Sequence, residues 1–244
     1  MNRIFVHIGA RKGSVGLKNK NLKNIFGKPL IIWTIHHAKM INKVFKTIVN
    51  TDSKQIANLS NKNGIDIVLK RPKKISNSKS SKFDAWKFAI KYLYDKKLIT
   101  NDDIFVDLDC TCPLRSVGSI NKMIDKFVSF KKQKKKFDGI FTITEARKNP
   151  YFNLVEINSN GYLKLSKEPK KRIVRRQDCP KVYEHVANAY IFKPEFIIKK
   201  KYLMAGKLIG HETKNFMSWD IDNKFDFKIV EYLLKLKKYV QYKK

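Results

Sequence analysis

The first 145 residues alternate between short apolar runs and amphipathic segments, and this alternation limits the fold more than any other feature of the chain. The apolar runs predict strands at residues 3–8, 45–52, 65–70, 103–109 and 138–144. The segments between them predict helices at residues 27–41, 53–63, 83–94 and 117–130. Such alternation is typical of parallel sheets with helices on both faces. We therefore expect an α/β protein with three layers and a mostly parallel sheet.

After residue 150 the pattern becomes richer in strands. Residues 152–158 and 162–165 predict a strand pair around a turn at 159–161, residues 182–192 predict a longer strand, and residues 225–240 predict a closing helix. A chain of 244 residues with 43% hydrophobic content is long enough for one well-buried α/β domain. We expect a single domain over 1–244, with residues 145–185 as a small excursion.

Three features of the chain bear on its compartment. It contains no run of eighteen apolar residues, and its first residues lack the apolar core of a signal peptide. Its three cysteines are Cys110, Cys112 and Cys179, which form neither a disulfide framework nor a four-ligand zinc spacing. We expect free thiols, a cytoplasmic protein and no membrane partner.

The formal net charge of +32 raises the possibility of a nucleic-acid-binding protein. Lysine, however, is spread through nearly every segment, and a run such as 131–136 is typical of a loop or a helix end. No zinc finger, RNP-type motif or recognition helix accompanies the charge. We expect no specific nucleic-acid partner, and a basic nucleic-acid-binding protein without activity stays an alternative.

The loop after the first strand, within HIGARKGSVGLKNKN (residues 7–21), combines glycines with cations. Gly13 and Gly16 allow successive backbone N–H groups to face an anion, and Arg11, Lys18 and Lys20 add positive charge. The loop matches neither the Walker A pattern nor the GxGxxG dinucleotide pattern. It predicts a binding site for a polyphosphate.

Two later segments carry carboxylates that are candidates for a site. Asp220 and Asp222 in SWDID stand two residues apart, so in an extended segment they face one way and are able to ligate Mg²⁺; the alternative is a turn or a cap. Asp109 ends the strand at 103–109, and Arg115 follows near the next helix. The alternative for this pair is strand-end polarity and helix capping.

Taken together, these segments resemble one family, the CMP-nonulosonate (acylneuraminate) cytidylyltransferases. The matching opening is ARKGSVGLKNKN (10–21), in which Arg11, Gly13, Ser14, Gly16, Lys20 and Asn21 coincide with the family pattern. It is followed, in the family's order, by NTD (50–52), RP (71–72), TCPLR (111–115), NPYFNLVE (149–156), RRQDCPKVYE (175–184) and WDID (219–222). The resemblance covers essentially the whole chain, and Asp109 with the RRQDCPKVYE segment looks closest to the legionaminate-type branch.

The resemblance implies a glycosyltransferase-A-like (Rossmann-like) nucleotidyltransferase, usually a homodimer, that joins CTP to a nonulosonic acid and releases pyrophosphate. It makes Lys20, Arg11, Asp220 and Asp222 the expected catalytic residues. CTP is expected to contact Arg11, Gly13, Ser14, Lys20, Asn21, Arg71 and Asp109. Mg²⁺ is expected to bind Asp220, Asp222 and Asp109. The sugar acid is expected to contact Arg176, Gln177, Asn188 and Tyr190, in or near a sugar-binding or dimerisation excursion.

The chain departs from the family pattern at several positions. Val15 replaces a lysine of the phosphate loop, with Lys12 and Lys18 as candidates to take its part, and Val186 replaces an asparagine. We assign Cys110 and Cys112, which stand where the family carries Pro or Val and Ser, to packing. A related enzyme for the eight-carbon acid Kdo stays an alternative, although the expected QGD strand end is absent.

Overall fold

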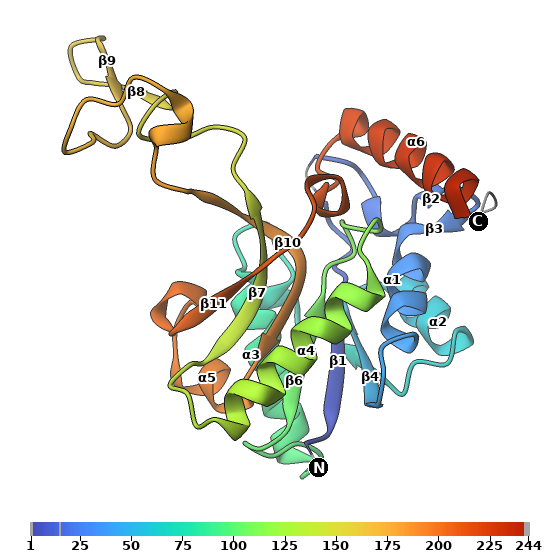
Figure 1. Cartoon of the computed structure of the whole chain (residues 1–244). Helices are drawn as coiled ribbons and strands as arrows, with labels where there is room; N and C mark the ends of the chain where they lie inside the picture. The colour runs from blue at the N-terminus through green and yellow to red at the C-terminus, as the bar shows by residue number, and fades with distance from the viewer. Residues whose placement is uncertain (1, 15, 242–244) are drawn as a thin grey trace.

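The computed structural model describes residues 2–14 and 16–241; Val15 lies outside the described residues. Its main feature is one twisted seven-stranded sheet in the order β11-β7-β10-β6-β1-β4-β5 (Figure 1). The strands are β1 (Ile4–Gly9), β4 (Val44–Thr51), β5 (Ile67–Lys70), β6 (Ile104–Leu108), β7 (Gly139–Glu145), β10 (Tyr183–Phe192) and β11 (Leu208–Glu212). Neighbouring strands are parallel except around β10, which runs antiparallel to β6 and β7. The predicted mostly parallel sheet is confirmed.

Helices cover both faces of the sheet and give it three layers. One face packs against α1 (Leu30–Lys39), α2 (Lys54–Lys62) and α4 (Val117–Lys132). The other face packs against α3 (Lys82–Asp95) and α5 (Pro194–Lys199). Serine side chains start three of the helices, because Ser53, Ser81 and Ser116 each accept a backbone N–H of the first turn. The apolar faces of the helices meet the buried strands and form the two halves of the core.

A third, smaller core lies at the end of the sheet where the parallel strands finish. There α6 (Lys224–Gln241) lies near the ribbon of β2 (Asn24–Ile25) and β3 (Lys28–Pro29) (Figure 1). The ribbon turns through Phe26 and Gly27, both with positive φ, as a two-residue hairpin requires. The predicted helix at 27–41 therefore begins only at Leu30, because this ribbon takes the preceding residues.

The chain leaves the sheet after β7 and returns through β10. Between them the arm (residues 147–182) extends away from the sheet and carries a short hairpin of β8 (Val155–Ile157) and β9 (Leu163–Leu165) (Figure 1). The arm starts and ends at the same edge of the sheet, since Tyr183 pairs with Glu145. The returning strand must then run opposite to its neighbours, which explains why β10 is antiparallel.

Three elements had no counterpart in the sequence analysis: β2, α5 and β11. Strand β11 pairs parallel with β7 and brings the chain back to the edge where the other parallel strands end. Short 3₁₀ turns join the elements, at Lys20–Leu22, Lys73–Ile75, Arg176–Asp178, Leu203–Ala205 and Asn215–Ser218. No helix in the described ranges combines the length and the hydropathy that crossing a membrane requires.

Candidate active site

The loop after β1 is tied to the neighbouring strand by its backbone. The amide of Ala10 donates to the carbonyl of Asn50 at 3.0 Å, and the amide of Lys12 donates to the Asp52 carboxylate at 2.6 Å. Farther along, the side chain of Asn21 donates to the carbonyl of Arg11 at 3.1 Å. The loop is therefore closed on itself and fixed at the carboxyl end of the sheet, the edge where ligands of open α/β sheets bind.

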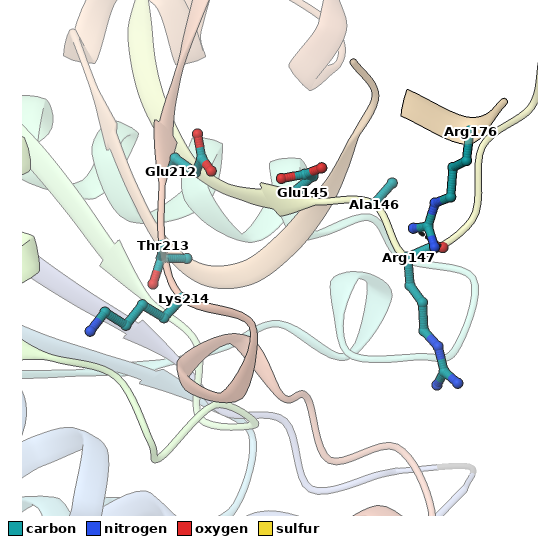
Figure 2. A pocket seen from close by; sticks show the side chains of 7 residues that line it. All are labelled: Glu145, Ala146, Arg147, Arg176, Glu212, Thr213 and Lys214. Atoms are coloured by element: carbon teal, nitrogen blue, oxygen red, sulfur yellow. Dashed lines mark hydrogen bonds between the residues drawn. The ribbon is translucent and has the colours of Figure 1, made fainter. Parts of the chain in front are cut away.

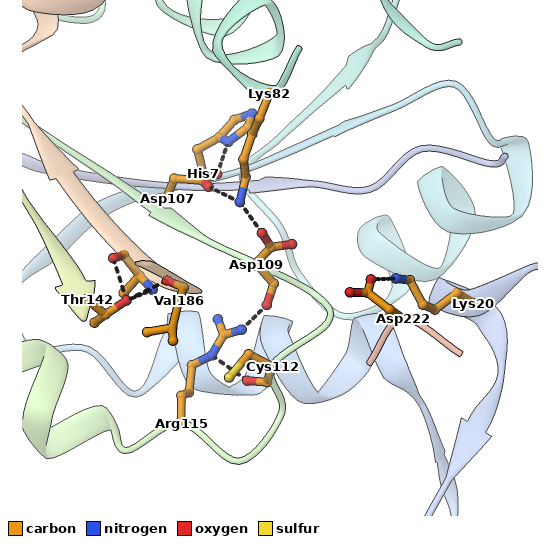
Figure 3. A network of polar contacts seen from close by, with 11 residues as sticks. His7, Lys20, Lys82, Asp107, Asp109, Cys112, Arg115, Thr142, Val186 and Asp222 are labelled. Carbon is orange, nitrogen blue, oxygen red and sulfur yellow. Dashed lines mark hydrogen bonds and ion pairs between the residues drawn. The ribbon is translucent and has the colours of Figure 1, made fainter. Parts of the chain in front are cut away.

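The same loop packs against the segment that holds the two C-terminal aspartates. A Cβ on Gly16 would come within 2.2 Å of the carbonyl oxygen of Asp222, so this close approach requires glycine. Lys20 donates to the carbonyl of Ile221 at 2.5 Å and lies 3.3 Å from an Asp222 carboxylate oxygen (Figure 3). The amide of Ile221 in turn donates to the carbonyl of Thr111. Three segments distant in sequence thus meet at one edge.

Asp220 is the aspartate of this segment that faces inward. Burial, together with the charges of Asp109 and Asp222, raises its pKa to about 6 against the opposing effects of Thr111 and Lys20. One of its oxygens is buried and has no hydrogen-bond partner among the described residues. Asp222, by contrast, has a side chain that is 76% exposed.

An orphaned carboxylate oxygen surrounded by negative charge is a suitable ligand for a hard cation. The donor set at this edge therefore fits Mg²⁺, which Asp220 and Asp222 could hold. Within the described part of the chain no three acidic, histidine or cysteine side chains form a ready cluster. A cation held by two carboxylates would need further ligands such as phosphate oxygens or water, as is usual for Mg²⁺.

A buried network continues from this edge along β6 (Figure 3). Asp107 contacts His7 Nδ1 at 2.6 Å and Lys82 Nζ at 3.3 Å, and Lys82 also forms an ion pair with Asp109. Burial opposes the charge on Asp107, but Lys82 and His7 outweigh it and lower the pKa of this carboxyl. Lys82 keeps its charge for the same reason, since Asp109 and Asp107 raise its pKa in spite of burial. The sequence analysis did not identify Lys82.

Arg115 holds the turn after β6 through hydrogen bonds to its backbone. Its guanidinium donates to the carbonyls of Asp109 and Cys112, and its side chain is buried (Figure 3). Arg115 therefore shapes the segment that carries Asp109, and it does not face a hollow. Cys110 and Cys112 are buried beside it, and burial raises the pKa of each thiol to about 12. Both are protonated at neutral pH.

The other residues expected to contact CTP lie around the same loop. Gly13 has open space where a Cβ would stand, and Ser14 follows it half-buried. Arg11 donates to the carbonyl of Asn77 at 2.6 Å. Arg71 is buried, donates to the carbonyl of Ile75, and feels the charges of Asp52 and Arg11. Arg11 and Arg71 thus lie within electrostatic reach of each other beside the loop.

Two adjoining hollows lie between the sheet edge and the base of the arm. The first has a volume of about 560 Å³ and is lined by Glu145, Ala146, Arg147, Arg176, Glu212, Thr213 and Lys214 (Figure 2). The second, of about 530 Å³, is lined by Thr144, Glu145, Arg147, Glu184, His185, Val186, Ala187, Ser218, Trp219 and Asp220. Glu145 and Arg147 line both hollows, so the two adjoin; we call them together the tract, with Arg176 in the first hollow and Asp220 in the second.

The residues expected to contact the sugar acid divide into two groups. Arg176 lies at the tract and donates to the carbonyl of Arg147 at 2.7 Å, with the exposed Gln177 next to it. Asn188 and Tyr190 are buried within β10 and line neither hollow. Asn188 donates to the carbonyl of Met217, and the Tyr190 ring packs under Lys82. Val186, the departure from the family pattern, lines the second hollow.

Comparisons with known proteins agree with this geometry. A family model described as "Cytidylyltransferase" matches residues 6–243. The chain is 34% identical to "Post-translational flagellin modification protein B" of Campylobacter coli, over 97% of each chain. It is 35% identical, again over 97% of each, to "CMP-N,N'-diacetyllegionaminic acid synthase" of Campylobacter jejuni subsp. jejuni serotype O:2.

A solved structure of CMP:2-keto-3-deoxy-manno-octonic acid synthetase complexed with CTP has the same fold. The TM-score is 0.69 at 16% identity, and the match covers 97% of this chain and 100% of the other. The resemblance found from the motifs is confirmed by the family match and by the relatives. The chain belongs to the cytidylyltransferase family and is a nucleotidyltransferase enzyme.

Proposed function

We propose that this enzyme transfers CMP from CTP to the anomeric hydroxyl of a nonulosonic acid and releases pyrophosphate, with Mg²⁺ as its cofactor. The observation that carries the proposal is the meeting of the glycine loop, Lys20 and two aspartates at the edge where the tract from Arg176 ends. The full-length similarity to a relative named as a CMP-N,N'-diacetyllegionaminic acid synthase supports the same reaction.

The loop residues 10–21 and Lys20 hold the triphosphate in this proposal. Lys20 presents an ammonium group whose partners are the carbonyl of Ile221 and the Asp222 carboxylate. Arg11 and Arg71 add positive charge from the neighbouring segments. A fixed array of donors stabilises the charge that develops on the phosphates as the α-phosphorus is attacked, without having to reorganise.

Asp220 and Asp222 hold the cation in this proposal. Bound Mg²⁺ would neutralise phosphate charge and lower the pKa of the attacking hydroxyl. Lys20 lies beside Asp222 and orients this carboxylate, while the hydrogen bond between Ile221 and Thr111 fixes the backbone between the two aspartates. The segment thus holds Asp220 inward and Asp222 toward solvent, with Asp222 beside Lys20.

The tract from Arg176 to Asp220 receives the sugar acid in this proposal. Arg147 and Arg176 offer guanidinium groups to its carboxylate, for which their planar geometry is suited. Val186, Ala187 and Trp219 give the second hollow an apolar wall that accommodates the methyl of an acetamido group. Such a mixture favours a diacetamido acid of the legionaminate type over Kdo, which has no acetamido group.

A pyrophosphate-release assay tests this function. The enzyme is incubated with CTP, Mg²⁺ and one acid at a time from a panel of diacetyllegionaminate, N-acetylneuraminate, pseudaminate and Kdo. We expect the fastest release with the legionaminate-type acid, a preference for CTP over other nucleotides, and no release with sugar 1-phosphates. Preference for Kdo would contradict the substrate class, and no release with any acid would contradict the reaction.

Salt-resistant, sequence-selective binding of RNA or DNA would instead favour the alternative of a basic nucleic-acid-binding protein. Weak binding that fades steeply with salt is the expected result, because unspecific contacts of lysines with phosphates release counterions. Fluorescence anisotropy with labelled oligonucleotides at two salt concentrations distinguishes the two cases.

We also propose that the arm joins two copies of the chain. Its hairpin exposes Ile157 at 74%, Tyr162 at 71% and Leu163 at 68%, and Val174 beyond it is 74% exposed. Apolar side chains gathered in this way mark an interaction surface. A second copy covers them in this proposal, which makes the enzyme a homodimer.

A further inference from the structure

Lys82 is a charged residue at the site edge that the proposed reaction does not use. It is the first residue of α3, and its ammonium group lies between the carboxylates of Asp107 and Asp109 (Figure 3). The ammonium also lies 4.5 Å from the ring centroid of Tyr190 and 5.7 Å from that of Trp86. These contacts hold the lysine head in one place, and cations over aromatic faces are attracted to them.

The two carboxylates that Lys82 bridges differ in their other contacts. They stand two residues apart and face the same side of β6. Asp107 is fully buried and is also held by His7 at 2.6 Å. Asp109 lies just beyond the end of the strand with a side chain that is 17% exposed, and Lys82 is its side-chain ion-pair partner in the described residues. Of the two, Asp109 is therefore the one whose position depends on Lys82.

Asp109 stands close to the proposed metal ligands in the fold. Thr111, two residues after it, accepts the amide of Ile221 between Asp220 and Asp222. The amide of Asp109 donates to the carbonyl of Asn188, whose side chain holds Met217 ahead of the same aspartates. An Asp109 carboxylate released from Lys82 would be a third acidic group at the edge, and a small hard cation attracts such a group.

We propose that Lys82 is a positioning residue that fixes and neutralises the Asp109 carboxylate, which keeps Asp109 out of the ligand set of the cation and leaves the cation to Asp220 and Asp222. This inference rests on the proposed function. It replaces the resemblance-based expectation that Asp109 ligates Mg²⁺ with a role for Asp109 beside the metal. Lys82 and Asp109 then form an oriented ion pair beside the metal ligands.

Mg²⁺ binding without nucleotide or sugar tests the charge arrangement directly. Isothermal titration calorimetry is run on the wild type, Lys82→Met, Asp109→Asn and the double variant, with Lys91→Met as a matched control that removes an exposed lysine of the same helix. Lys82→Met frees an anion and should tighten Mg²⁺ binding about three- to tenfold, whereas Asp109→Asn leaves a cation and should weaken it. The double variant should return to near the wild-type value.

Unchanged or weaker Mg²⁺ binding in Lys82→Met would overturn the proposal. If that variant is unfolded by circular dichroism, Lys82→Gln replaces it, because the amide keeps donors to both carboxylates without the charge. The titration does not depend on the reaction, so a wild type that releases no pyrophosphate would contradict the proposed function and still allow this test.

Turnover gives a second readout, which distinguishes a positioning role of Lys82 from a purely structural role. Lys82→Met should lower kcat at least about tenfold, with a smaller change in the KM for CTP, and Lys82→Arg should restore most of the loss because it keeps a charged donor to both carboxylates. In an Asp109→Asn background Lys82→Met should add little, since the two residues act together. Losses that simply add would show that Lys82 supports the fold independently of Asp109.

Discussion

The carboxyl edge of the sheet and the arm differ in whether their side chains have partners within the chain. At the edge the charged groups have protein partners, as Lys20 has Ile221 and Asp222, and Lys82 has Asp107 and Asp109. On the arm, large apolar groups such as Ile157 and Leu163 face outward. The edge is thus organised within one chain before any ligand arrives, whereas the arm presents a surface that a single chain leaves uncovered. The difference separates the region that we propose for the chemistry from the region that we propose for assembly.

The largest effect should come from the inward aspartate of the edge. Asp220→Ala removes the buried, unpaired oxygen that we assign to Mg²⁺, and turnover should fall by about two to three orders of magnitude or more. Circular dichroism should stay unchanged. Asp125→Ala, which removes an exposed carboxylate of α4, is the control. Full activity of Asp220→Ala would contradict the assignment of Asp220 as a Mg²⁺ ligand. It would also contradict our proposal that the reaction takes place at this edge of the sheet.

Lys20 offers the next largest effect. Lys20→Ala deletes a charge-assisted hydrogen bond worth roughly 1.5–3 kcal/mol, so CTP binding or turnover should fall about 10- to 100-fold. Lys18→Ala is the matched control, because Lys18 is an exposed lysine of the same loop. Equal losses in the two variants, measured by CTP titration, would mean that the overall charge of the loop acts rather than the contact of Lys20.

A substitution on the arm should change the oligomeric state of the enzyme more than it changes turnover. Ile157→Lys places a charge in the apolar surface that we assign to a second copy, so the dimer should dissociate at micromolar concentration. Sedimentation velocity measures the change. Lys164→Ile, on the same hairpin, is a control that keeps the surface apolar. A wild type that sediments as a monomer would contradict the pairing of copies through the arm.

The smallest effect concerns thiol reactivity. Cys179 on the arm is half-buried, whereas Cys110 and Cys112 at the edge are buried with a pKa of about 12. These edge thiols are shielded and stay protonated at pH 8, so a maleimide should label one cysteine in the native protein and all three after unfolding. Mass spectrometry of the labelled peptides identifies which residue reacts, and rapid labelling of Cys112 would show that the edge opens.

The same two thiols give a pH dependence of stability. Their folded pKa lies above the unfolded value of about 8.5, so above that pH the unfolded chain binds fewer protons than the folded one. Their contribution is therefore complete below pH 8.5 and is lost as the pH rises toward 12. Urea unfolding at pH 7.5 and 9.5 should show a smaller decrease in the Cys110→Ala/Cys112→Ala variant than in the wild type.

Local patterns were sufficient to place most elements and part of the site. Apolar runs of five to eight residues gave the parallel strands, because such runs are buried on both faces. Lys20 and Asp222 were chosen from their motifs, and the structure brings them within 3.3 Å of each other. Strand β11 was missed because it is short and interrupted by Gly210, where the side chain of Ile143 packs against the backbone.

The sequence by itself determined the alternation that builds the three layers, and it carried the glycines and charges of the loop. Only the tertiary structure decided the direction of β10, because that depends on where the arm starts and ends. It also decided that Asn188 and Tyr190 are buried supports within β10 and that Lys82 lies between two carboxylates. These outcomes depend on contacts between residues far apart in the chain, and local periodicity carries no information about which distant charges become neighbours.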